Sequence, residues 1–220
     1  MLPFHLVVLG PQGSGKGTQN ELLSQKFQMP VLIPGDLLRN KAKENSPLGK
    51  KIQKILAKGG LAPHLVTKKL MSEALARTAP EQTVIFDSWP RALPQIKHFE
   101  DILKKQRKVQ DFKVLVIQIS KPEAIKRLAA RRVCEKCFRN FKPPESLTLK
   151  RCPYCGGRLI QRSDDFPQAI EKRLKIYEEE TKPVINYFQK KKKKILYING
   201  EQSIPKVFQE IEQKLKKESD

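Results

Sequence analysis

The sequence predicts an α/β fold in which a doubly wound, five-stranded parallel sheet is flanked by helices. The β-type segments are continuous apolar runs rather than alternating ones, as in strands that are covered on both faces. Segments with helical periodicity separate these runs, which is the order of elements in an α/β domain. The stretch GPQGSGKGTQ at residues 10–19 directly follows the first run, and a glycine-rich turn in this place joins a strand to a helix.

The strands and helices of this fold can be placed in chain order. The predicted strands are the runs FHLVVL, VLI, TVIFD, KVLVIQI and ILYI, at residues 4–9, 31–33, 83–87, 113–119 and 195–198. The predicted helices lie near residues 15–27, 36–58, 64–78, 93–107, 122–132, 167–189 and 204–217. In the first of these helices Leu22, Leu23 and Phe27 recur at helical spacing.

Two segments, 34–63 and 126–164, interrupt the alternation of strands and helices. The first holds helical patterns with no strand between them and ends in Gly59 and Gly60, and the second carries all four cysteines. In open α/β sheets the ligand lies at the carboxyl ends of the strands, where such excursions would emerge. Both segments are therefore predicted to be lids over a ligand site in one domain of 220 residues.

The glycine-rich stretch has the composition of a phosphate-binding loop. Gly13, Gly15 and Gly17 leave room for backbone N–H groups to wrap an anion at the start of a helix. Lys16 adds a positive charge, and Thr18 lies where a phosphate oxygen would bind. The usual pattern has Ser or Thr directly after the lysine, whereas Gly17 intervenes here. The alternative is a turn that only joins the strand to the helix.

The charge of the chain is strongly positive, with 44 basic and 23 acidic residues and a net charge of +21. This balance raises nucleic acid as a partner. The charge is spread along the chain, however, apart from the run KKKKK at 190–194, which we interpret as a solvated loop. No stretch has the roughly 18 apolar residues of a membrane span, and the N-terminus does not have the pattern of a signal peptide. We expect a soluble, cytoplasmic protein with no membrane partner.

The cysteines form two C-x2-C pairs, Cys134 with Cys137 and Cys152 with Cys155. Two pairs of this spacing can bring four thiolates to one tetrahedral Zn²⁺. Disulfides are the alternative, but they are typical of secreted proteins, and the sequence shows no secretory context. A metal with four thiolate ligands has no position left for water or substrate, so the predicted zinc is structural.

Several motifs, in their order and spacing, resemble those of adenylate kinases over essentially the whole chain. They are GPQGSGKGTQ at 10–19, GDLLR at 35–39, Asp87-x-x-Pro90-Arg91 with Gln95, LAARR at 128–132, the four-cysteine insert, QRSDD at 161–165 and KRL at 172–174. Lys-Gly-Thr, in place of lysine followed directly by Ser or Thr, is the form that this family uses.

The resemblance implies a reaction and a division of the chain. The reaction is the reversible, Mg²⁺-dependent transfer of a phosphoryl group from ATP to AMP, which gives two ADP. The phosphate-loop core would comprise residues 1–33, 64–125 and 165–220, with a helical insert at 34–63 that binds the nucleoside monophosphate and a zinc-binding lid at 126–164. The resemblance further implies a monomer whose partners are these two small substrates, with no specific nucleic-acid partner.

The resemblance also implies site residues, by matching position. ATP would contact Gly13, Ser14, Gly15, Lys16, Gly17, Thr18, Arg127, Arg131, Asn140, Phe141 and Gln202. AMP would contact Pro34, Arg39, Gly60, Leu61, Ala62, Ser88, Trp89, Pro90, Arg91, Gln95, Arg162 and Arg173. The catalytic set would be Lys16, Asp87, Arg91, Arg131, Arg162 and Arg173. Asp87 would orient waters on Mg²⁺, Asp164 and Asp165 would anchor the lid hinge, and Trp89 has core packing as its alternative role.

Two positions depart from the family pattern near the acceptor base. Pro34 stands where the family usually has Thr, and Ser88 where it usually has Gly. Gln95, which reads adenine in the family, is retained, so AMP remains the expected acceptor. A kinase for UMP, CMP or GMP is one alternative. The other is a non-catalytic, nucleotide-dependent RNA-binding module, which would account for the charge and the cysteines but not for the arginines at kinase spacings.

Overall fold

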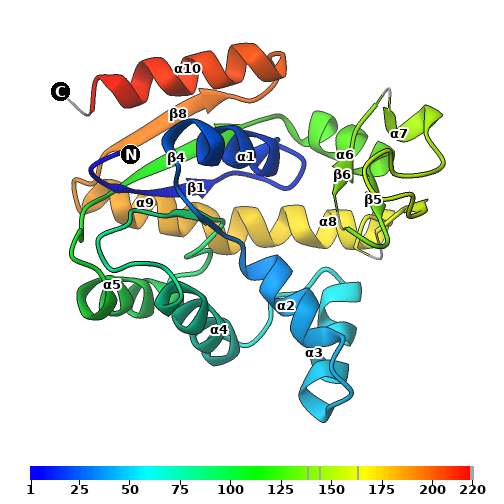
Figure 1. Cartoon of the computed structure of the whole chain (residues 1–220), viewed down its shortest axis with the longest axis horizontal. Coiled ribbons are helices and arrows are strands. Elements are labelled where there is room, and N and C mark those ends of the chain that lie inside the picture. Colours follow the sequence, from blue (N-terminus) through cyan, green and yellow to red (C-terminus); the bar gives the residue numbers. More distant parts are fainter. Residues whose placement is uncertain (138, 144, 163, 219–220) are drawn as a thin grey trace.

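The central sheet has five parallel strands in the order β2-β3-β1-β4-β8 (Figure 1). The computed structural model describes residues 1–137, 139–143, 145–162 and 164–218, so Ser163 of the QRSDD motif lies outside the described residues. The strands are β1 His5–Leu9, β2 Val31–Leu32, β3 Ile85–Asp87, β4 Phe112–Gln118 and β8 Ile195–Asn199. The predicted fold class is confirmed, and each predicted strand is present with its ends shifted by one or two residues.

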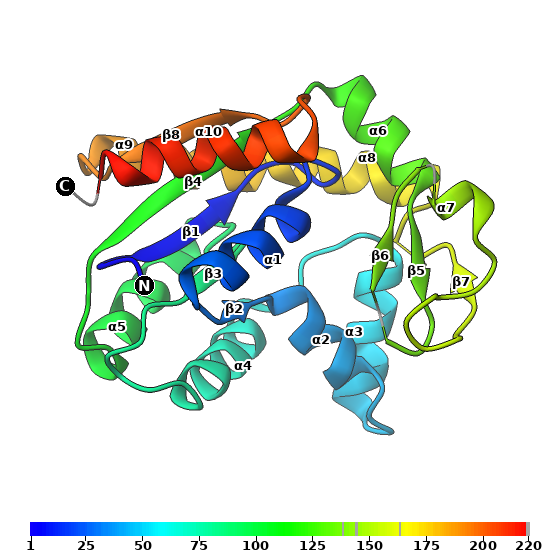
Figure 2. The same cartoon turned by 45° about the horizontal axis from the view of Figure 1, so that its top comes forward.

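Helices cover both faces of this sheet, as Figures 1 and 2 show. Val7 and Leu9 point to one face, where the core contains side chains of three helices: α4 His64–Ala76, α5 Pro94–Gln106 and α9 Lys182–Lys190. Leu6 and Val8 point to the opposite face and pack with two helices: α1 Lys16–Phe27 and α10 Ile204–Lys216. Because successive strand residues face opposite sides, burial on both faces explains why the strands are continuous apolar runs.

The helical pattern predicted near 36–58 forms two helices, α2 Pro34–Ala42 and α3 Pro47–Ala57, with no strand between them. Pro47 disfavours helical backbone at the residue before it, so the first helix cannot continue through this point. Ser46 then caps the second helix, since its hydroxyl accepts a hydrogen bond from Gly49 N–H at 3.0 Å. Pro34 occupies the first position of α2, where a missing N–H has no cost.

The helical segment predicted at 167–189 is continuous but not uniform. It consists of α8 Pro167–Ile176, one wide turn Tyr177–Thr181 with π-helical geometry, and α9. The wide turn ends two residues before Pro183, whose missing N–H leaves the helix one backbone hydrogen bond short. Among the residues that the structure describes, no helix combines the length and the apolar character needed to cross a membrane.

A second, smaller sheet in segment 126–164 was not predicted. It is antiparallel, in the order β6-β5-β7, with β5 Arg132–Cys134, β6 Asn140–Phe141 and β7 Leu159–Ile160. The helix predicted at 122–132 is shorter, because α6 Lys121–Ala130 ends before Arg132 enters β5. A short helix, α7 Glu145–Thr148, follows β6. Figure 2 shows this small sheet and the α2–α3 pair projecting from the same end of the molecule.

Candidate active site

A cavity of about 1180 Å³ lies between segments 34–63 and 126–164 and the ends of the central strands. The loop after β1 and the residues at the end of β3 line it, so it occupies the carboxyl edge of the sheet, as expected for this fold. The structure brings the predicted nucleotide-contact residues together around this cavity, with two exceptions, Phe141 and Pro90.

The two exceptions have different surroundings. Phe141 is 3% exposed and packs against Cys134 and Cys152 inside the small sheet's core. Its neighbour Asn140 lines the cavity instead, because successive residues of a strand face opposite sides. Pro90 is buried beneath the cavity wall. The side chains of Phe141 and Pro90 therefore act on the site only through the residues next to them.

The phosphate-loop backbone adopts conformations that require glycine. Gly13 and Gly15 have φ of +86° and +92°, where side chains are strongly disfavoured. A Cβ on Gly13 would also meet the carbonyl oxygen of Ala124 at 3.0 Å. Helix α1 begins at Lys16 without a side-chain cap, so the N–H groups of its first turn have no capping partner. This helix start can bind an anion.

Lys16 is folded back onto the loop. Its Nζ donates hydrogen bonds to the carbonyl oxygens of Gly10 at 2.7 Å and Pro11 at 2.8 Å. Burial is the main cause that lowers the pKa of Lys16 to about 7. The charge of Asp87 acts to raise this pKa, and the charges of nearby arginines such as Arg91 lower it further. The Lys16 ammonium therefore has one carboxylate, Asp87, and several cations near it, and a polyphosphate would add negative charge that favours the protonated lysine.

Three arginines converge on two neighbouring carboxylates beside the cavity. Arg131 donates to both oxygens of Asp165, at 2.7 and 2.6 Å, and Arg162 donates to both oxygens of Asp164, at 2.9 Å each. Arg173 bridges the pair, since its Nη1 donates to the Asp165 carboxylate and to the Asp164 carbonyl oxygen, at 2.8 Å in both cases. The two aspartates thus fix the orientation of all three guanidinium groups.

The charge of this cluster is unbalanced. Burial acts to raise the pKa of Asp164, but Arg162 and Arg173 outweigh it and lower the pKa to about 2. Burial lowers the pKa of Arg173 to about 10, so its guanidinium remains charged at neutral pH. Three cations therefore face two anions, and the excess positive charge borders the cavity.

Two further arginines, Arg39 and Arg91, lie on the side of the cavity that segment 34–63 forms. Arg39 is paired with Asp36 on the first turns of α2. Arg91 donates from Nε to the carbonyl oxygen of Ser88 at 3.0 Å. Burial lowers the pKa of Arg91, Asp87 acts to raise it, and the charge of Arg39 lowers it further. The two guanidinium groups are thus close enough to influence each other across the cavity.

Gln95 has internal partners at both ends of its amide. Its Oε1 accepts a hydrogen bond from the Arg91 backbone N–H at 2.9 Å, and its Nε2 lies 3.3 Å from His64 Nδ1. With the histidine proton on Nε2, Nδ1 accepts from the Gln95 amide, which holds the amide in one orientation. His64 was missed from the sequence because a single histidine at the start of a helix carries no distinctive pattern.

Ser88 and Trp89 form the wall at the end of β3. Ser88 has φ of +56°, a left-handed conformation that is uncommon for residues other than glycine, and its hydroxyl donates to Asp87 at 2.8 Å. Trp89 is 1% exposed and packs its ring edge-on against Phe99, at 5.3 Å between ring centroids. Trp89 therefore belongs to the core and also borders the cavity.

The far end of the cavity is formed by α6 and the turn after β8. Arg127 donates to Glu123 at 2.6 Å and to the carbonyl oxygen of Gly200 at 2.9 Å, which joins these two elements. The Gln202 amide nitrogen donates to Glu210 at 2.7 Å. The predicted base contacts of the donor nucleotide are thus side by side.

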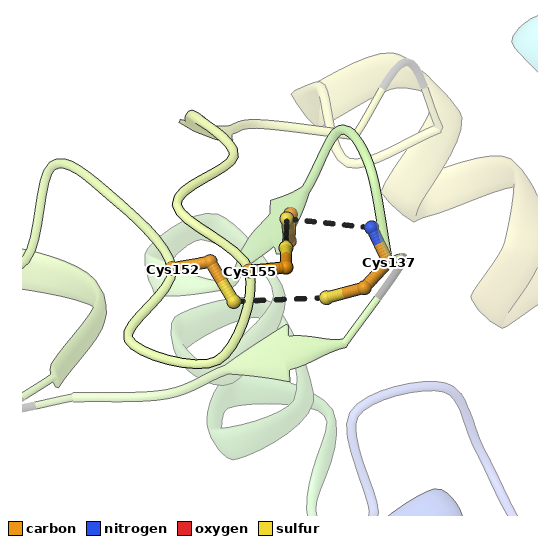
Figure 3. Close-up of side chains that lie close together, drawn as sticks. Cys137, Cys152 and Cys155 are labelled. Carbon is orange, nitrogen blue, oxygen red and sulfur yellow. Dashed lines mark hydrogen bonds between the residues drawn. The ribbon is translucent and has the colours of Figure 1, made fainter.

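The four cysteines form one cluster: Cys134 ends β5, and Figure 3 shows Cys137 lying opposite Cys152 and Cys155. Their Sγ atoms all lie within 4.8 Å of one another, and all four thiols are free. Cys134 Sγ is 3.4 Å from Cys155 Sγ, and Cys137 Sγ is 3.6 Å from Cys152 Sγ. A tetrahedral site with metal–sulfur bonds of about 2.3 Å has sulfur–sulfur edges of about 3.8 Å. The cluster therefore has the dimensions of a four-thiolate metal site.

Comparisons with known proteins agree with this geometry. The family model for adenylate kinase matches residues 8–193. The chain is 36% identical to the adenylate kinase of Caldanaerobacter subterraneus subsp. tengcongensis, over 96% of both chains. It is 35% identical to the adenylate kinase of Archaeoglobus fulgidus, over 97% of this chain and 99% of the relative. The chain belongs to the adenylate kinase family.

Because the chain belongs to this family of phosphotransferases, Pro34 and Ser88 are departures from the family pattern on the acceptor side of the site. The glycine usual in the family would adopt the φ of Ser88 without strain, and the serine keeps this conformation while its hydroxyl bonds to Asp87. Pro34 retains the start of α2 but offers neither the threonine hydroxyl nor a backbone N–H. Both residues line the cavity.

The adenylate kinase motifs also did not identify Lys142, which lines the same cavity. Lys142 directly follows β6 and contacts Thr18 in the first turn of α1. The sequence offered no signal for it, because lysine is abundant throughout the chain.

Proposed function

We propose that the protein catalyses the reversible transfer of the γ-phosphoryl group of Mg·ATP to AMP, which gives two ADP. The observation that carries the proposal is the arrangement of cations around one cavity. Lys16 and the cluster of Arg131, Arg162 and Arg173 occupy one part of it, and Arg39 and Arg91 occupy another. Two separate cation sets in one cavity suit two phosphate-bearing substrates that meet between them.

On the donor side, the start of α1 and Lys16 would hold the phosphates of ATP, and Arg127 and Gln202 would contact its base. On the acceptor side, Arg39 would exchange Asp36 for the AMP phosphate, and Arg91 would bind the same phosphate. Arg131, Arg162 and Arg173 would surround the phosphoryl group between the two nucleotides. Guanidinium groups suit this role because their planar forks match phosphate oxygens.

Catalysis in this arrangement would come from positioning and charge. An oxygen of the AMP phosphate attacks the γ-phosphorus of ATP, and the bond from that phosphorus to the bridging oxygen of the β-phosphate breaks. Negative charge spreads over the transferring group during this step, and fixed cations stabilise it. The Asp164 and Asp165 carboxylates keep the three arginines oriented before the substrates arrive, so little reorganisation is needed.

Magnesium bound with ATP would neutralise phosphate charge and orient the phosphates. Asp87 fits this ion, because its carboxylate lines the cavity close enough to Lys16 to affect the lysine pKa. In this role Asp87 would orient water molecules on the ion.

We also propose the division of the chain into a core, a monophosphate-binding segment at 34–63 and a lid at 126–164. Support comes from the projection of both segments over one cavity. Closing them over the substrates would exclude water, which could otherwise accept the phosphoryl group.

A coupled assay with ATP and each nucleoside monophosphate tests the proposal. We expect AMP to give the highest kcat/KM, because a base that cannot pair with Gln95 would leave its polar atoms unsatisfied at a cost of roughly 1–3 kcal/mol each. Preference for UMP, CMP or GMP would replace the proposal with the corresponding kinase. No transfer to any monophosphate would contradict it.

The double substitution Pro34→Thr with Ser88→Gly is expected to tighten AMP binding. Glycine relieves the left-handed strain at residue 88, and threonine restores a hydroxyl at the start of α2. Both positions border the base rather than the transferring group, so KM for AMP should fall more than kcat changes. Steady-state kinetics with AMP varied at saturating ATP measure this, and a higher KM in the double variant would show that the two residues build a different acceptor pocket.

We propose that the cysteine cluster holds one structural zinc ion. Its sulfur spacing fits four thiolate ligands, since the four Sγ atoms all lie within 4.8 Å of one another. Few apolar residues support segment 126–164, so the metal would contribute to its folding free energy.

Protein purified without added zinc is expected to contain one zinc per chain by elemental analysis. The variant Cys137→Ser should lose most of the metal and unfold at a lower temperature, whereas Ser14→Ala in the phosphate loop should keep it. A full set of free thiols with no metal in the native protein would contradict the zinc proposal.

The positive charge of the chain does not require a nucleic-acid partner. Within the run at 190–194, Lys193 pairs with Asp111 at 3.3 Å and Lys194 pairs with Glu218 at 2.9 Å. We propose a monomer that binds small nucleotides and has no sequence-specific nucleic-acid partner. The internal pairing of these lysines, together with the spread of charge along the chain, supports the absence of a sequence-specific nucleic-acid partner.

A further inference from the structure

Lys142 extends from the cysteine-bearing segment to the first turn of α1. Its Nζ donates a hydrogen bond to Thr18 Oγ1 at 2.5 Å. Thr18 lies two residues after Lys16, and all three side chains line the cavity. The contact joins residues 124 positions apart in the chain. Lys142 is therefore placed at the phosphate loop by the fold and not by local sequence.

The charge around Lys142 is unusual for a partly buried lysine. Burial lowers its pKa, and the charges of Arg127 and Arg131 lower it further. Those two arginines have carboxylate partners of their own, Glu123 and Asp165. Among the residues that the structure describes, no carboxylate forms an ion pair with Lys142, and the polar partner that its ammonium contacts is the neutral hydroxyl of Thr18.

A partly buried ammonium among cations is unfavourable unless an anion joins it. The nearest place for an anion is the phosphate loop that Lys142 already touches. We infer that Lys142 binds the triphosphate of the donor nucleotide. Segment 126–164 would thereby contribute one cation to the donor site, in addition to Lys16 of the phosphate loop. This inference rests on the proposed donor site and adds a residue to it.

The position of Lys142 suggests what the contact does. In the structure the Lys142 ammonium donates its hydrogen bond to the Thr18 hydroxyl. A phosphate oxygen beside Thr18 would accept this bond instead, and both the donor and the acceptor would then be charged. Because the lysine belongs to segment 126–164, this bond would form only when that segment is closed over the donor. Binding of ATP would thereby favour closure.

A purely structural role is the competing explanation. In that case the Lys142–Thr18 bond only fixes segment 126–164 against the core. Loss of the bond would then affect ATP and AMP alike, through a less stable segment. Direct binding to the triphosphate would affect ATP alone.

The test compares Lys142→Met with Lys142→Arg and with the matched control Lys150→Met, an exposed lysine of the same segment. Calorimetry gives the Kd of ATP and of AMP for each zinc-loaded protein. We expect Lys142→Met to weaken ATP binding about tenfold, as for loss of one charge-assisted hydrogen bond, and to leave AMP binding within about twofold. Lys142→Arg should restore most of the affinity, and Lys150→Met should match the wild type.

Two results would overturn the inference. One is unchanged ATP affinity in Lys142→Met, and the other is an equal loss for ATP and AMP together with a lower unfolding temperature. Failure of the proposed function gives a different result, because the wild type would then show no transfer from ATP to AMP. A wild type that is active, with ATP binding insensitive to residue 142, refutes only the role of Lys142.

Discussion

Replacing Lys16 with alanine is expected to lower turnover about a thousandfold while the fold stays intact. The structure surrounds this ammonium with loop carbonyl oxygens and brings Asp87 and several arginines close enough to affect its pKa. It is the cation within the loop that would bind the transferring phosphate, and loss of one electrostatic contact in such a site costs on the order of a hundred- to thousandfold in rate. Turnover at saturating ATP and AMP measures the effect.

Lys191→Ala is the matched control for this prediction. The Lys191 ammonium lies 5.8 Å from the ring centroid of Tyr187 at the end of α9, and Lys191 does not line the cavity. Its removal should change turnover by less than about twofold and should slightly lower stability at most. An equally deep loss of activity from both substitutions would mean that the division between site lysines and surface lysines is wrong. Circular dichroism of both variants checks that the fold is retained.

Much of the fold could be predicted because its strands are covered on both faces. Residues 4–9 and 113–119 read as largely apolar runs for that reason. The phosphate loop could be predicted because Gly13 and Gly15 adopt positive φ, a conformation that favours glycine and so leaves a recognisable sequence pattern. The small sheet of segment 126–164 could not be predicted in the same way. Its strands have only two or three residues each, too few for a periodic pattern, and its core contains cysteine side chains beside Phe141.

The candidate site was predictable where residues act within motifs and unpredictable where they meet only in space. Lys16 and Arg91 belong to short motifs, so their positions identified them. His64 and Lys142 contact Gln95 and Thr18 across 31 and 124 residues of chain, and each is a common residue type in an ordinary surrounding. Such contacts depend on the final fold, and a sequence with 44 basic residues gives no reason to prefer one lysine over another.

The partners of Asp164 and Asp165 could not be predicted from the sequence either. The sequence predicted a hinge role from the QRSDD motif, but it could not show that one carboxylate would serve two arginines. Asp165 is 0% exposed and accepts hydrogen bonds from Arg131 and Arg173, while the more exposed Asp164 pairs with Arg162. Each aspartate therefore has one arginine of its own and both contact Arg173, and this arrangement follows from how segment 126–164 meets α8.

Asp165→Asn is expected to lower the free energy of unfolding by about 3 kcal/mol. The substitution keeps the volume of the side chain but removes the negative charge, so Arg131 and Arg173 remain largely buried without their shared anion. Removing one partner of a buried ion pair typically costs about 3–5 kcal/mol, and the partial exposure of the arginines places this case at the lower end. Urea denaturation of the zinc-loaded protein, followed by circular dichroism without nucleotide, measures the difference.

The control for this substitution is Glu171→Gln, on the exposed face of α8. It makes the same change of charge in solvent and should alter the free energy of unfolding by no more than about 0.5 kcal/mol. A loss below about 1 kcal/mol in Asp165→Asn would show that water or the Asp164 carboxylate already compensates the two arginines. The cluster would then be held by Asp164, and the orientation of the arginines before substrate binding, on which the proposed catalysis depends, would have to come from that residue instead.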